Sequence, residues 1–395
     1  MGEAYIVAAV RTACGRKNGR LSRIHPIDLG ATVVDELLDR TNIPTDAVDD
    51  LIFGCVNQIG AQASNIGRNI SLSSRLDVSV PGTTVDRQCG SSLQAIHFAA
   101  QAVMSGTQDL VIAGGVEAMS MVPIGANVRD GAEKGHGVPK GERMEEIYPG
   151  IEFSQFTGAE LLAKKYHIGR NELDKFGVLS HQRAAAASKQ GLFRDEIVPV
   201  EVVLEDGSLT THLLDEGIRH DTNLAAMSAL SPLHPEGVIT AGTASQISDG
   251  AAAVMIASKR AVEKYGLLVR ARIHTLSVVG SDPVIMLEGP IPATEKLLER
   301  AGLSIDDIDL YEVNEAFGSV PLAWLKATGA DIKKLNVNGG AQALGHPLGA
   351  TGAKLMTTLL HELERRGARF GLVAICEGGG TANATLIERV DGFDW

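Results

Sequence analysis

The sequence predicts an α/β protein made of two similar halves, with a long segment inserted between them. Short apolar or β-branched runs alternate with alanine- and leucine-rich amphipathic stretches, which is typical of strands and helices packed in layers. The runs of the first part recur in the last part at a nearly constant offset. A chain of 395 residues is also too long for one compact core, so two or three domains are expected.

Each half has its own set of predicted elements. In the first half, strands are predicted at residues 5–10, 51–56, 82–85 and 110–113, and helices at 28–39 and 91–104. In the second half, strands are predicted at residues 271–279, 310–313, 335–337, 372–376 and 384–388, and helices at 293–300, 317–326 and 352–364.

Matching short motifs indicate an internal duplication. VDDL at 48–51 resembles IDDI at 305–308, VNQ at 56–58 resembles VNE at 313–315, and LVIA at 110–113 resembles LVAI at 372–375. The offset is 257 residues for the first two pairs and 262 for the third, and adding 257 to Cys89 gives His346. We interpret the matches as two copies of one unit, related by a pseudo-two-fold axis.

The inserted segment sets the predicted domain boundaries. The first half comprises residues 1–117 and 250–269, the insertion 118–249, and the second half 270–395. The insertion is rich in glycine, proline and charge, with helices predicted at 159–166 and 172–190. So long an excursion is usually functional, such as a lid or a binding loop, and the alternative is a surface insertion without a role.

Charge and cysteine content argue against several classes of protein. The net charge of −12 disfavours a nucleic acid or an anionic membrane as partner, because both require a basic surface. The four cysteines form neither a disulfide framework nor a metal-ligand spacing, so no metal site is expected. The N-terminus lacks a secretion signal, and no window approaches about 18 uninterrupted apolar residues. A protein of the reducing cytoplasm is therefore expected.

Cys89 lies between a predicted strand and a predicted helix. At a helix start the first N–H groups are unpaired and the dipole is positive, which favours a thiolate. Gly90 and Ser91 after it would let a substrate approach closely. The alternative is a small buried hydrophobe, which is what most lone cysteines are.

His346 lies in a window, 336–352, that contains five glycines. Such a backbone can pack closely against something bulky, and Pro347 suits the first position of a helix. A histidine there can donate a hydrogen bond to an oxyanion or pair with a thiolate. A structural histidine is the alternative.

Cys376 ends a predicted strand and precedes the run EGGG at 377–380. Glycines at a strand end free backbone N–H groups to point at a ligand, as oxyanion holes require. A cysteine with a tuned pKa can act as a general base or acid. A phosphate loop is excluded, because G-x-x-x-x-G-K-[ST] is absent and Asn383 occupies the third-glycine place of G-x-G-x-x-G.

Four motifs together resemble the signature blocks of the thiolases. They are QCGS at 88–91, NEAF at 314–317, GHP at 345–347 and CEGGG at 376–380. They occur in the family order over essentially the whole chain, so the set is specific although each block alone is weak. The resemblance implies a five-layer α-β-α-β-α architecture of two similar halves, with a loop domain that carries much of the coenzyme A (CoA) site.

The resemblance also implies roles for individual residues. Cys89 takes the acyl group as a thioester, and Cys376 removes or returns the α-proton. His346, with a water held by Asn314, forms one oxyanion hole, and the backbone N–H groups of Cys89 and Gly378 form the other. The reaction is ping-pong: CoA cleaves a 3-ketoacyl-CoA, or two acetyl-CoA condense. CoA is then a substrate, and no cofactor or metal is required.

The residues that contact CoA in the thiolases match this sequence less completely. Residues 240–251 resemble the family block T-A-G-N-A-S-G-x-N-D-G-A, in which Ser245 matches the serine that touches the pantetheine arm. The block departs from the family at Thr243, Gln246 and Ser248. Arg219 resembles a CoA-binding arginine near the nucleotide end, and the alternative is a solvated charge.

Other departures bear on the substrate. Ser92 and Glu377 stand where glycine and a small apolar residue are common in the family. Residues 153–160 lack the Met-Gly pair of short-chain biosynthetic members. We therefore expect a degradative enzyme of β-oxidation that takes a longer or bulkier acyl group, including a steroid-derived one. A biosynthetic acetoacetyl-CoA thiolase is the alternative.

Three further classes of protein fit the sequence less well. A ketoacyl synthase requires a G-T-N-A-H-type block and lacks the second cysteine, and a sterol-carrier-type thiolase has His-Asp-Cys-Phe in place of NEAF. A non-catalytic CoA-binding relative is disfavoured by the intact set of Cys89, Asn314, His346 and Cys376. The resemblance implies a homodimer through the first half, often paired into a homotetramer through the loop domain.

Overall fold

The two halves form sheets with the same strand order. The structure, a computed structural model, describes residues 2–204 and 206–390. Within these residues, hydrogen bonds join the strands of both halves into one 11-stranded sheet; the first half contributes the sheet β4-β3-β5-β9-β1, and the second contributes the sheet β11-β12-β13-β10. The first set is β1 (Tyr5–Thr12), β3 (Asp50–Gly54), β4 (Gly82–Val85), β5 (Leu110–Ala118) and β9 (Ser248–Ala257). The second set is β10 (Ala271–Gly280), β11 (Leu310–Val313), β12 (Phe370–Glu377) and β13 (Thr381–Arg389).

When the strands are numbered by their order within each half, corresponding strands are neighbours in both sheets. In both sheets the last strand runs antiparallel between the first strand and the one before it in sequence. The two sheets meet where β1 pairs with β10, at Tyr5 with Arg272 and Ile6 with Ala271. The repeated topology matches the duplication expected from the sequence motifs.

The predicted strand at 335–337 is wrong as a strand. It contributes one isolated bridge, between Leu335 and Tyr311, in the place that β4 takes in the first half. Asn336 has a φ of 42°, in the left-handed region. Its side-chain amide accepts from the Val313 N–H and donates to the Val313 C=O, both at 2.9 Å. Backbone bonds remain at Tyr311, whose N–H donates to Lys334 O and whose O accepts from Asn336 N, and the Asn336 side chain replaces the ladder at Val313.

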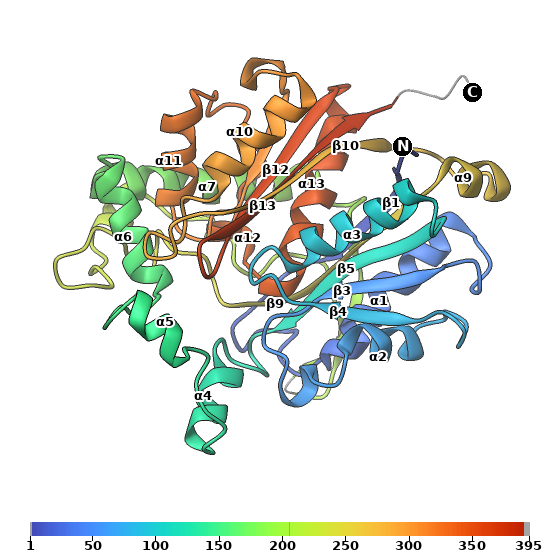
Figure 1. The fold of residues 1–395 in the computed structure, drawn as a ribbon, viewed down its shortest axis with the longest axis horizontal. Helices are drawn as coiled ribbons and strands as arrows, with labels where there is room; N and C mark the ends of the chain where they lie inside the picture. Colours follow the sequence, from blue (N-terminus) through green and yellow to red (C-terminus); the bar gives the residue numbers. More distant parts are fainter. Residues whose placement is uncertain (1, 205, 391–395) are drawn as a thin grey trace.

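Helices cover both faces of both sheets in five layers (Figure 1). The helices α3 (Ser91–Ser105) and α13 (Thr351–Arg366) lie between the sheets. The outer layers are α1 (Pro26–Thr41) and α2 (Ile66–Ser73) on the first sheet, and α10 (Pro290–Ala301) and α11 (Ser319–Thr328) on the second. Strand residues alternate between the cores, so that Leu372 packs toward the outer helices and Val373 toward the middle layer. The expected α-β-α-β-α architecture is confirmed.

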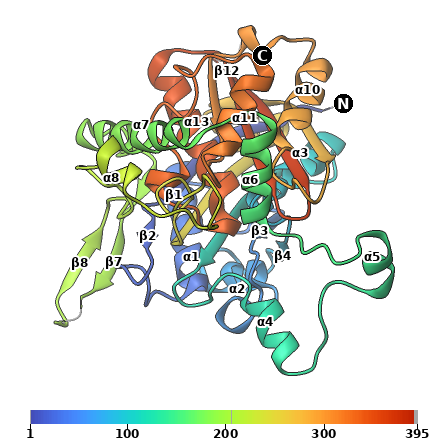
Figure 2. The same cartoon turned by 90° about the vertical axis from the view of Figure 1, so that its left-hand side faces the viewer.

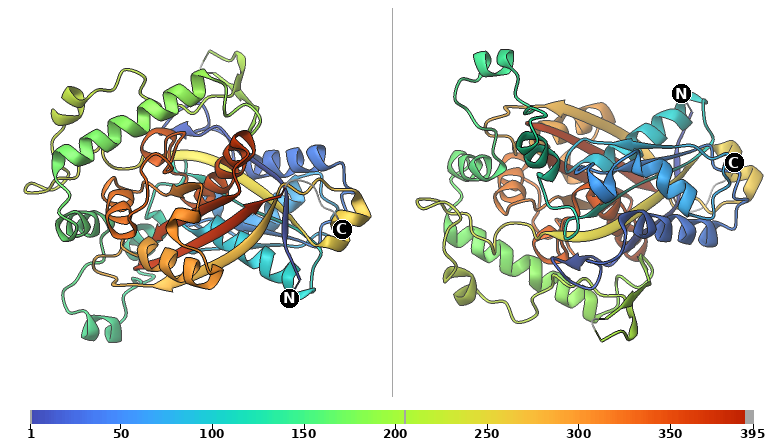
Figure 3. Two further views of the ribbon diagram at one scale, coloured as in Figure 1. Left: turned by 90° about the horizontal axis from the view of Figure 1, so that it is seen from above. Right: turned by 90° about the horizontal axis from the view of Figure 1, so that it is seen from below.

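The segment between β5 and β9 folds around the two-sheet body. An arm with α4 and α5 extends from one side, and the hairpin of β7 and β8 projects from another (Figure 2). The helix α7 runs along one flank of the molecule (Figure 3). The elements are α4 (Ala126–Glu133), α5 (Glu142–Ile147), α6 (Gln155–Lys165), α7 (Arg170–Lys189), β6 (Ile197–Val198), β7 (Val200–Val203), β8 (Leu209–His212) and α8 (Leu224–Ser228). The remaining short elements are β2 (Gly15–Arg16), α9 (Lys259–Tyr265) and α12 (Ala341–Leu344).

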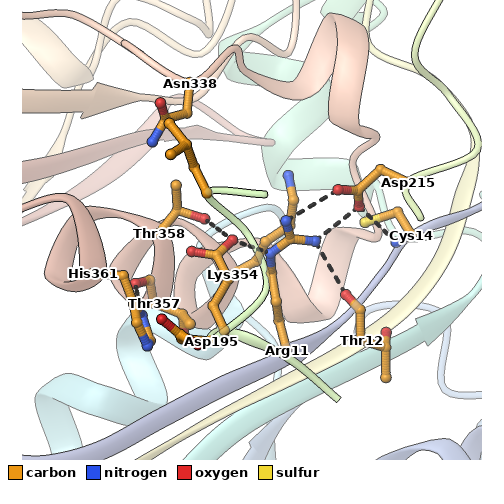
Figure 4. A network of polar contacts seen from close by, with 12 residues as sticks. Arg11, Thr12, Cys14, Asp195, Asp215, Asn338, Lys354, Thr357, Thr358 and His361 are labelled. Atoms are coloured by element: carbon orange, nitrogen blue, oxygen red, sulfur yellow. Dashed lines mark hydrogen bonds and ion pairs between the residues drawn. The ribbon is translucent and has the colours of Figure 1, made fainter. Parts of the chain in front are cut away.

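A buried ion-pair network fastens this segment to the first half (Figure 4). Arg11 of β1, whose side chain is fully buried, donates from Nε to Glu196 at 2.6 Å. Its two Nη atoms donate to the Asp215 carboxylate at 2.8 and 3.0 Å. Asp215 also accepts from the Cys14 N–H, and Glu196 accepts from the Thr358 hydroxyl of α13. The network therefore ties the insertion to β1 and to the central helix layer. Within residues 2–204 and 206–390, no helix combines the length and the apolar character that crossing a bilayer requires.

Candidate active site

Cys89 lies on a tight turn between β4 and α3. Gln88, directly before it, has a φ of 48°, a strained value for a residue with a side chain. The Ser91 hydroxyl braces the turn by accepting from the Arg87 N–H at 2.9 Å and donating to the Gln88 C=O at 2.6 Å. Cys89 itself is 8% exposed. The turn thus presents the thiol at the start of a central helix.

The expected thiolate at Cys89 is not the resting state. Burial, together with the nearby Glu377 carboxyl, raises the pKa of the Cys89 thiol to about 12. Removal from water penalises the charged form, and the backbone hydrogen bond at Cys89 lowers the pKa by less than burial raises it. A thiol at this position is protonated near neutral pH and requires a base before it can attack.

Cys376 ends β12 at a hairpin that lies against the Cys89 turn. The connection to β13 is made by Gly378, Gly379 and Gly380, of which the last two have left-handed φ values of 79° and 73°. A Cβ added to Gly378 would lie 3.0 Å from Gln88 Oε1. Burial raises the pKa of the Cys376 thiol well above its usual range, and the neighbouring Cys89 adds to the shift. The two sulfurs therefore lie close enough to interact electrostatically.

His346 and Asn314 form the second polar pair of the site. Asn314 follows β11, and its Nδ2 lies 3.4 Å from His346 Nε2. The Asn314 N–H donates to Ala374 O at 3.0 Å, two residues before Cys376 on the neighbouring strand. Burial, with Lys354 nearby, lowers the pKa of His346 to about 3, so the ring is neutral. The strand pair thus places the amide beside the cysteine strand.

The hydrogen bonds of His346 define which ring nitrogen carries the proton. The Thr351 hydroxyl donates its one proton to Pro347 O at 2.9 Å, so it accepts at 2.6 Å from Nδ1–H of His346. A neutral ring with its proton on Nδ1 leaves the Nε2 lone pair toward the site. His346 is thus arranged to accept a proton first and to donate it afterwards.

Close backbone contacts join the two halves at this point. A Cβ on Gly352, at the start of α13, would lie 2.2 Å from Leu93 N of α3. The Ala353 N–H donates to Ser92 Oγ at 3.0 Å, which gives the departure at Ser92 a structural role. The loop that carries His346 is therefore held against the helix that follows Cys89.

A buried carboxylate, Glu117, also holds the loop that carries His346. Glu117 at the end of β5 is fully buried and accepts from Gly349 N at 2.9 Å. It also accepts from the backbone N–H groups of Val56 and Asn57 and from the side-chain amides of Asn57 and Gln62. One acid thus links the loops after β3 and before α13.

Cys89 opens into a cavity of about 460 Å³. Gly378 and Leu348 also line this cavity, so the two turns and the His346 loop border one space. Its apolar wall comes from both halves and from the insertion: Val56, Ile124, Val128, Phe153, Met286 and Leu348. Among the residues that the structure describes, no group of three histidine, cysteine, aspartate or glutamate side chains is arranged to hold a metal ion.

The two predicted CoA contacts lie outside the wall of this cavity. Ser245 is half-buried, and its N–H donates to Ala316 O at 2.9 Å, beside the NEAF motif. Arg219 is exposed, and its backbone N–H donates to His181 Nδ1 of α7 at 3.1 Å. The structure thus brings Ser245 to the Asn314 loop and leaves Arg219 on the surface of the insertion.

Several residues that shape the site were not predicted as site residues. Ser248 Oγ accepts from the His346 N–H at 3.1 Å, and Thr351 holds the imidazole. Gln246 donates to Gly217 O and to Gln342 O, so it joins the insertion to the loop before His346. Two of these, Gln246 and Ser248, are departures from the family block, and that departure was the only signal in the sequence. Glu117 gave none.

Comparison with known proteins identifies the family. The chain matches the thiolase N-terminal domain over residues 4–260 and the thiolase C-terminal domain over residues 251–389. It is 54% identical over 392 residues to the steroid 3-ketoacyl-CoA thiolase FadA6 of Mycobacterium tuberculosis, covering 99% of this chain and 95% of that protein. It is 43% identical over 404 residues to the 3-ketoacyl-CoA thiolase of Serratia proteamaculans, covering 99% and 100%. The solved acetyl-CoA acetyltransferase of Bacillus anthracis matches with a TM-score of 0.90 at 37% identity, covering 99% of both chains. The chain therefore belongs to the thiolase family.

Proposed function

We propose that this thiolase works in degradation, cleaving a 3-ketoacyl-CoA with CoA to give acetyl-CoA and a shortened acyl-CoA. One observation carries the proposal: Cys89 of the first half, Gly378 of the hairpin that follows Cys376, and Leu348 of the His346 loop line one cavity. The names of the relatives in Mycobacterium tuberculosis and Serratia proteamaculans, both 3-ketoacyl-CoA thiolases, support cleavage as the working direction.

In the first half-reaction, Cys89 forms the acyl-enzyme. Its S–H proton passes to Nε2 of the neutral His346, and the thiolate attacks the 3-keto carbon. The resulting oxyanion accepts hydrogen bonds from the newly protonated Nε2 and from a water held by Asn314. The bond between C2 and C3 then breaks, and the carbanion carbon of acetyl-CoA takes the proton of the Cys376 thiol.

In the second half-reaction, CoA releases the acyl group. The Cys376 thiolate takes the S–H proton of CoA, and the CoA thiolate attacks the thioester carbon on Cys89. The backbone N–H groups of Cys89 and Gly378 stabilise the oxyanion of this step. Cys89 leaves as a thiolate and recovers its proton from His346, so both proton carriers return to their starting states.

The cavity supports a long or bulky acyl group. Its volume is about 460 Å³, and Val56, Ile124, Val128, Phe153, Met286 and Leu348 give it an apolar wall. Phe153 and Gln155, from the stretch that lacks the Met-Gly pair, border it. The 54% identical relative carries the word steroid in its name. We therefore place a steroid-derived side chain among the proposed substrates, with acetoacetyl-CoA synthesis as the alternative.

Thiolysis across acyl groups tests the proposal. We expect kcat/KM to be at least roughly tenfold higher for a long linear or polycyclic 3-ketoacyl-CoA than for acetoacetyl-CoA, as apolar contacts discriminate by such factors. The reverse preference would overturn the bulky substrate class. Failure to cleave any substrate, with no acyl group on Cys89 by mass spectrometry, would support the non-catalytic relative.

A filled cavity gives a sharper version of the same test. Ile124→Trp places a larger side chain on the cavity wall and reduces the space inside. It should therefore lower kcat/KM for the bulky substrate and leave kcat/KM for acetoacetyl-CoA unchanged. Ile147→Trp is the matched control, because Ile147 lies on the same arm and is 69% exposed. Equal effects of both variants on both substrates would place the acyl group elsewhere.

CoA binding and assembly complete the proposal. Ser245 contacts the pantetheine arm and Arg219 binds near the nucleotide end of CoA, so Arg219→Ala should raise the KM for CoA without changing kcat. The segment 118–249 carries most of this CoA site, between halves at 1–117 with 250–269 and at 270–395. The chain assembles as a homodimer or homotetramer, which light scattering tests, and works in a reducing cytoplasm, where its four free cysteines persist.

A further inference from the structure

Glu377 is a fully buried acid directly after Cys376. The family resemblance predicts a small apolar residue there, so the carboxyl group is a feature of this chain. Its Oε2 accepts from the Thr381 hydroxyl at 2.6 Å across the glycine hairpin. Its Oε1 is buried and has no hydrogen-bond partner in the part of the chain that the structure describes.

A second orphaned oxygen lies next to it. Asn383 Oδ1 is also buried without a partner among the described residues. A Cβ added to Gly90 would overlap Glu377 Oε1 and lie 2.8 Å from Asn383 Oδ1, so both oxygens border the same space beside Gly90. The Asn383 amide cannot turn over without loss, because its Nδ2 donates to Gly90 O at 3.0 Å.

Glu377 Oε1 and Asn383 Oδ1 are both buried acceptors, so a favourable contact between them requires a proton on the carboxyl group. A carboxylate and an amide oxygen repel each other, whereas a carboxylic acid can donate to the amide oxygen. Arg87 lies near enough to lower the pKa of Glu377, but its Nε does not bond to Glu377 Oε1, because both atoms are buried without a hydrogen-bond partner within residues 2–204 and 206–390. Burial raises the pKa of Glu377 to about 8, which agrees with a neutral acid at neutral pH.

The titratable groups around Glu377 come from three elements. Its own strand, β12, carries Cys376, and the turn before α3 carries Arg87 and Cys89. His97 of α3, bonded to Thr385 of β13, stays neutral because burial and Arg87 lower its pKa to about 3. An ionised Glu377 would raise the pKa of both active-site thiols.

We propose that Glu377 is a positioning residue for the acyl transfer, which rests as an uncharged acid bonded from Oε1 to Asn383 Oδ1 and keeps the two thiols more reactive while it holds that proton. The inference deepens the proposed function and rests on it. As the pH rises and Glu377 ionises, an anion appears beside both sulfurs, so forming a thiolate becomes harder. The thiol reactivity of the enzyme therefore rises less steeply with pH on the alkaline side than that of an isolated thiol.

Alkylation of the intact enzyme tests this without any acyl-CoA. Iodoacetamide labelling of Cys89 and Cys376 is followed by peptide mass spectrometry from about pH 6 to about pH 10 for the wild type and Glu377→Gln, since the amide mimics the neutral acid. The two proteins should react equally below about pH 7, and the variant should react about tenfold faster above about pH 9, which corresponds to one pKa unit. Glu388→Gln, the same change on β13 at the far end of the hairpin, should follow the wild type.

The outcomes separate the inference from its alternatives. A constant rate ratio across the pH range, or identical curves, would overturn the role of Glu377. Should the variant not fold, the wild type alone decides: its labelling rate must rise by less than about tenfold per pH unit near pH 8, and a full tenfold rise would refute the proposal. Labelling requires no acyl group, so an enzyme that rejects bulky substrates would still give a clear answer here.

Discussion

The two halves of the molecule share a sheet order but differ at the turn that precedes each central helix. In the first half, a strained turn carries Cys89 two residues before α3. In the second half, the corresponding loop carries His346 and a short 3₁₀ turn, Leu348–Ala350, before α13. Since α3 and α13 lie together between the sheets, both loops end at the same place. The duplication thus places two equivalent loops side by side, and they carry different groups: a thiol in the first half and an imidazole in the second.

The halves also differ in how their last two strands are joined. In the second half, three glycines connect β12 to β13, and Cys376 lies next to that hairpin. In the first half, residues 119–247 connect β5 to β9, and Gly114 stands at the position related to Cys376 by the offset of 262. The tight connection provides the second thiol and the N–H of Gly378. The long connection provides the cavity wall instead.

The largest effect is expected from removing the thiol of the first half. Cys89→Ala should lower kcat of thiolysis by roughly 10⁴-fold or more, as the loss of other covalent nucleophiles does. Cys55→Ala is the matched control, because Cys55 is a buried cysteine of the same half that packs in the outer core. Loss of the acyl adduct in the first variant and its retention in the second are measured by mass spectrometry. Activity of Cys89→Ala near the wild-type level would remove the functional difference between the halves.

The attachment of the insertion gives the next effect. Arg11→Met leaves Glu196 and Asp215 as buried carboxylates without their cation, so the free energy of unfolding should fall by about 3–5 kcal/mol. Arg75→Met removes exposed ion pairs with Asp35 and Asp39 and should cost about 0–1 kcal/mol. Urea unfolding of both variants measures the difference. Equal stabilities would mean that the buried network does not hold the insertion.

The histidine of the second half comes third. His346→Ala should lower kcat/KM by about 10²–10³-fold, the range found for oxyanion-hole groups. Because burial lowers the pKa of His346 to about 3, the ring stays neutral at all working pH values, and the pH–rate profile should lack an acid limb from it. His97→Ala is the control, since His97 is a buried neutral histidine of the same helix layer. A comparable loss in both variants would indicate a packing defect rather than chemistry.

The sequence singled out Cys89 and Gly378, which the structure brings to one cavity, but it did not predict the contacts that hold them there. The cysteine and histidine motifs were visible because each follows a strand end and is flanked by glycine, which few structural positions require. The strand β9 was missed because its run of small residues, including Ala251–Ala253, has weak strand propensity and is fixed only by burial between β1 and β5. The predicted thiolate failed for a related reason, since burial is a property of the fold.

Long-range polar partners escaped prediction because no local pattern marks them. Arg11 and Asp215 are separated by 204 residues, and Glu117 and Gly349 by 232. A single acid or arginine in a strand is interpreted as a solvated charge until the fold shows what surrounds it. The duplication, in contrast, was recognisable because it repeats over several motifs in one register.

The smallest effect concerns the support of the second-half loop. Thr351→Val removes the hydroxyl that accepts from His346 Nδ1 and should lower kcat/KM by about tenfold, or about 1.4 kcal/mol, since the imidazole loses the bond that fixes its tautomer. Thr351→Ser retains the hydroxyl and should restore activity, which a purely structural role of the methyl group would not allow. Thr357→Val is the matched control on α13, because that hydroxyl donates to Ala353 O of its own helix. If Thr351→Val keeps full activity, or if serine fails to restore activity, then the backbone of the loop before α13 alone orients His346. The two halves would then differ less in their supporting contacts than the hydrogen bonds indicate.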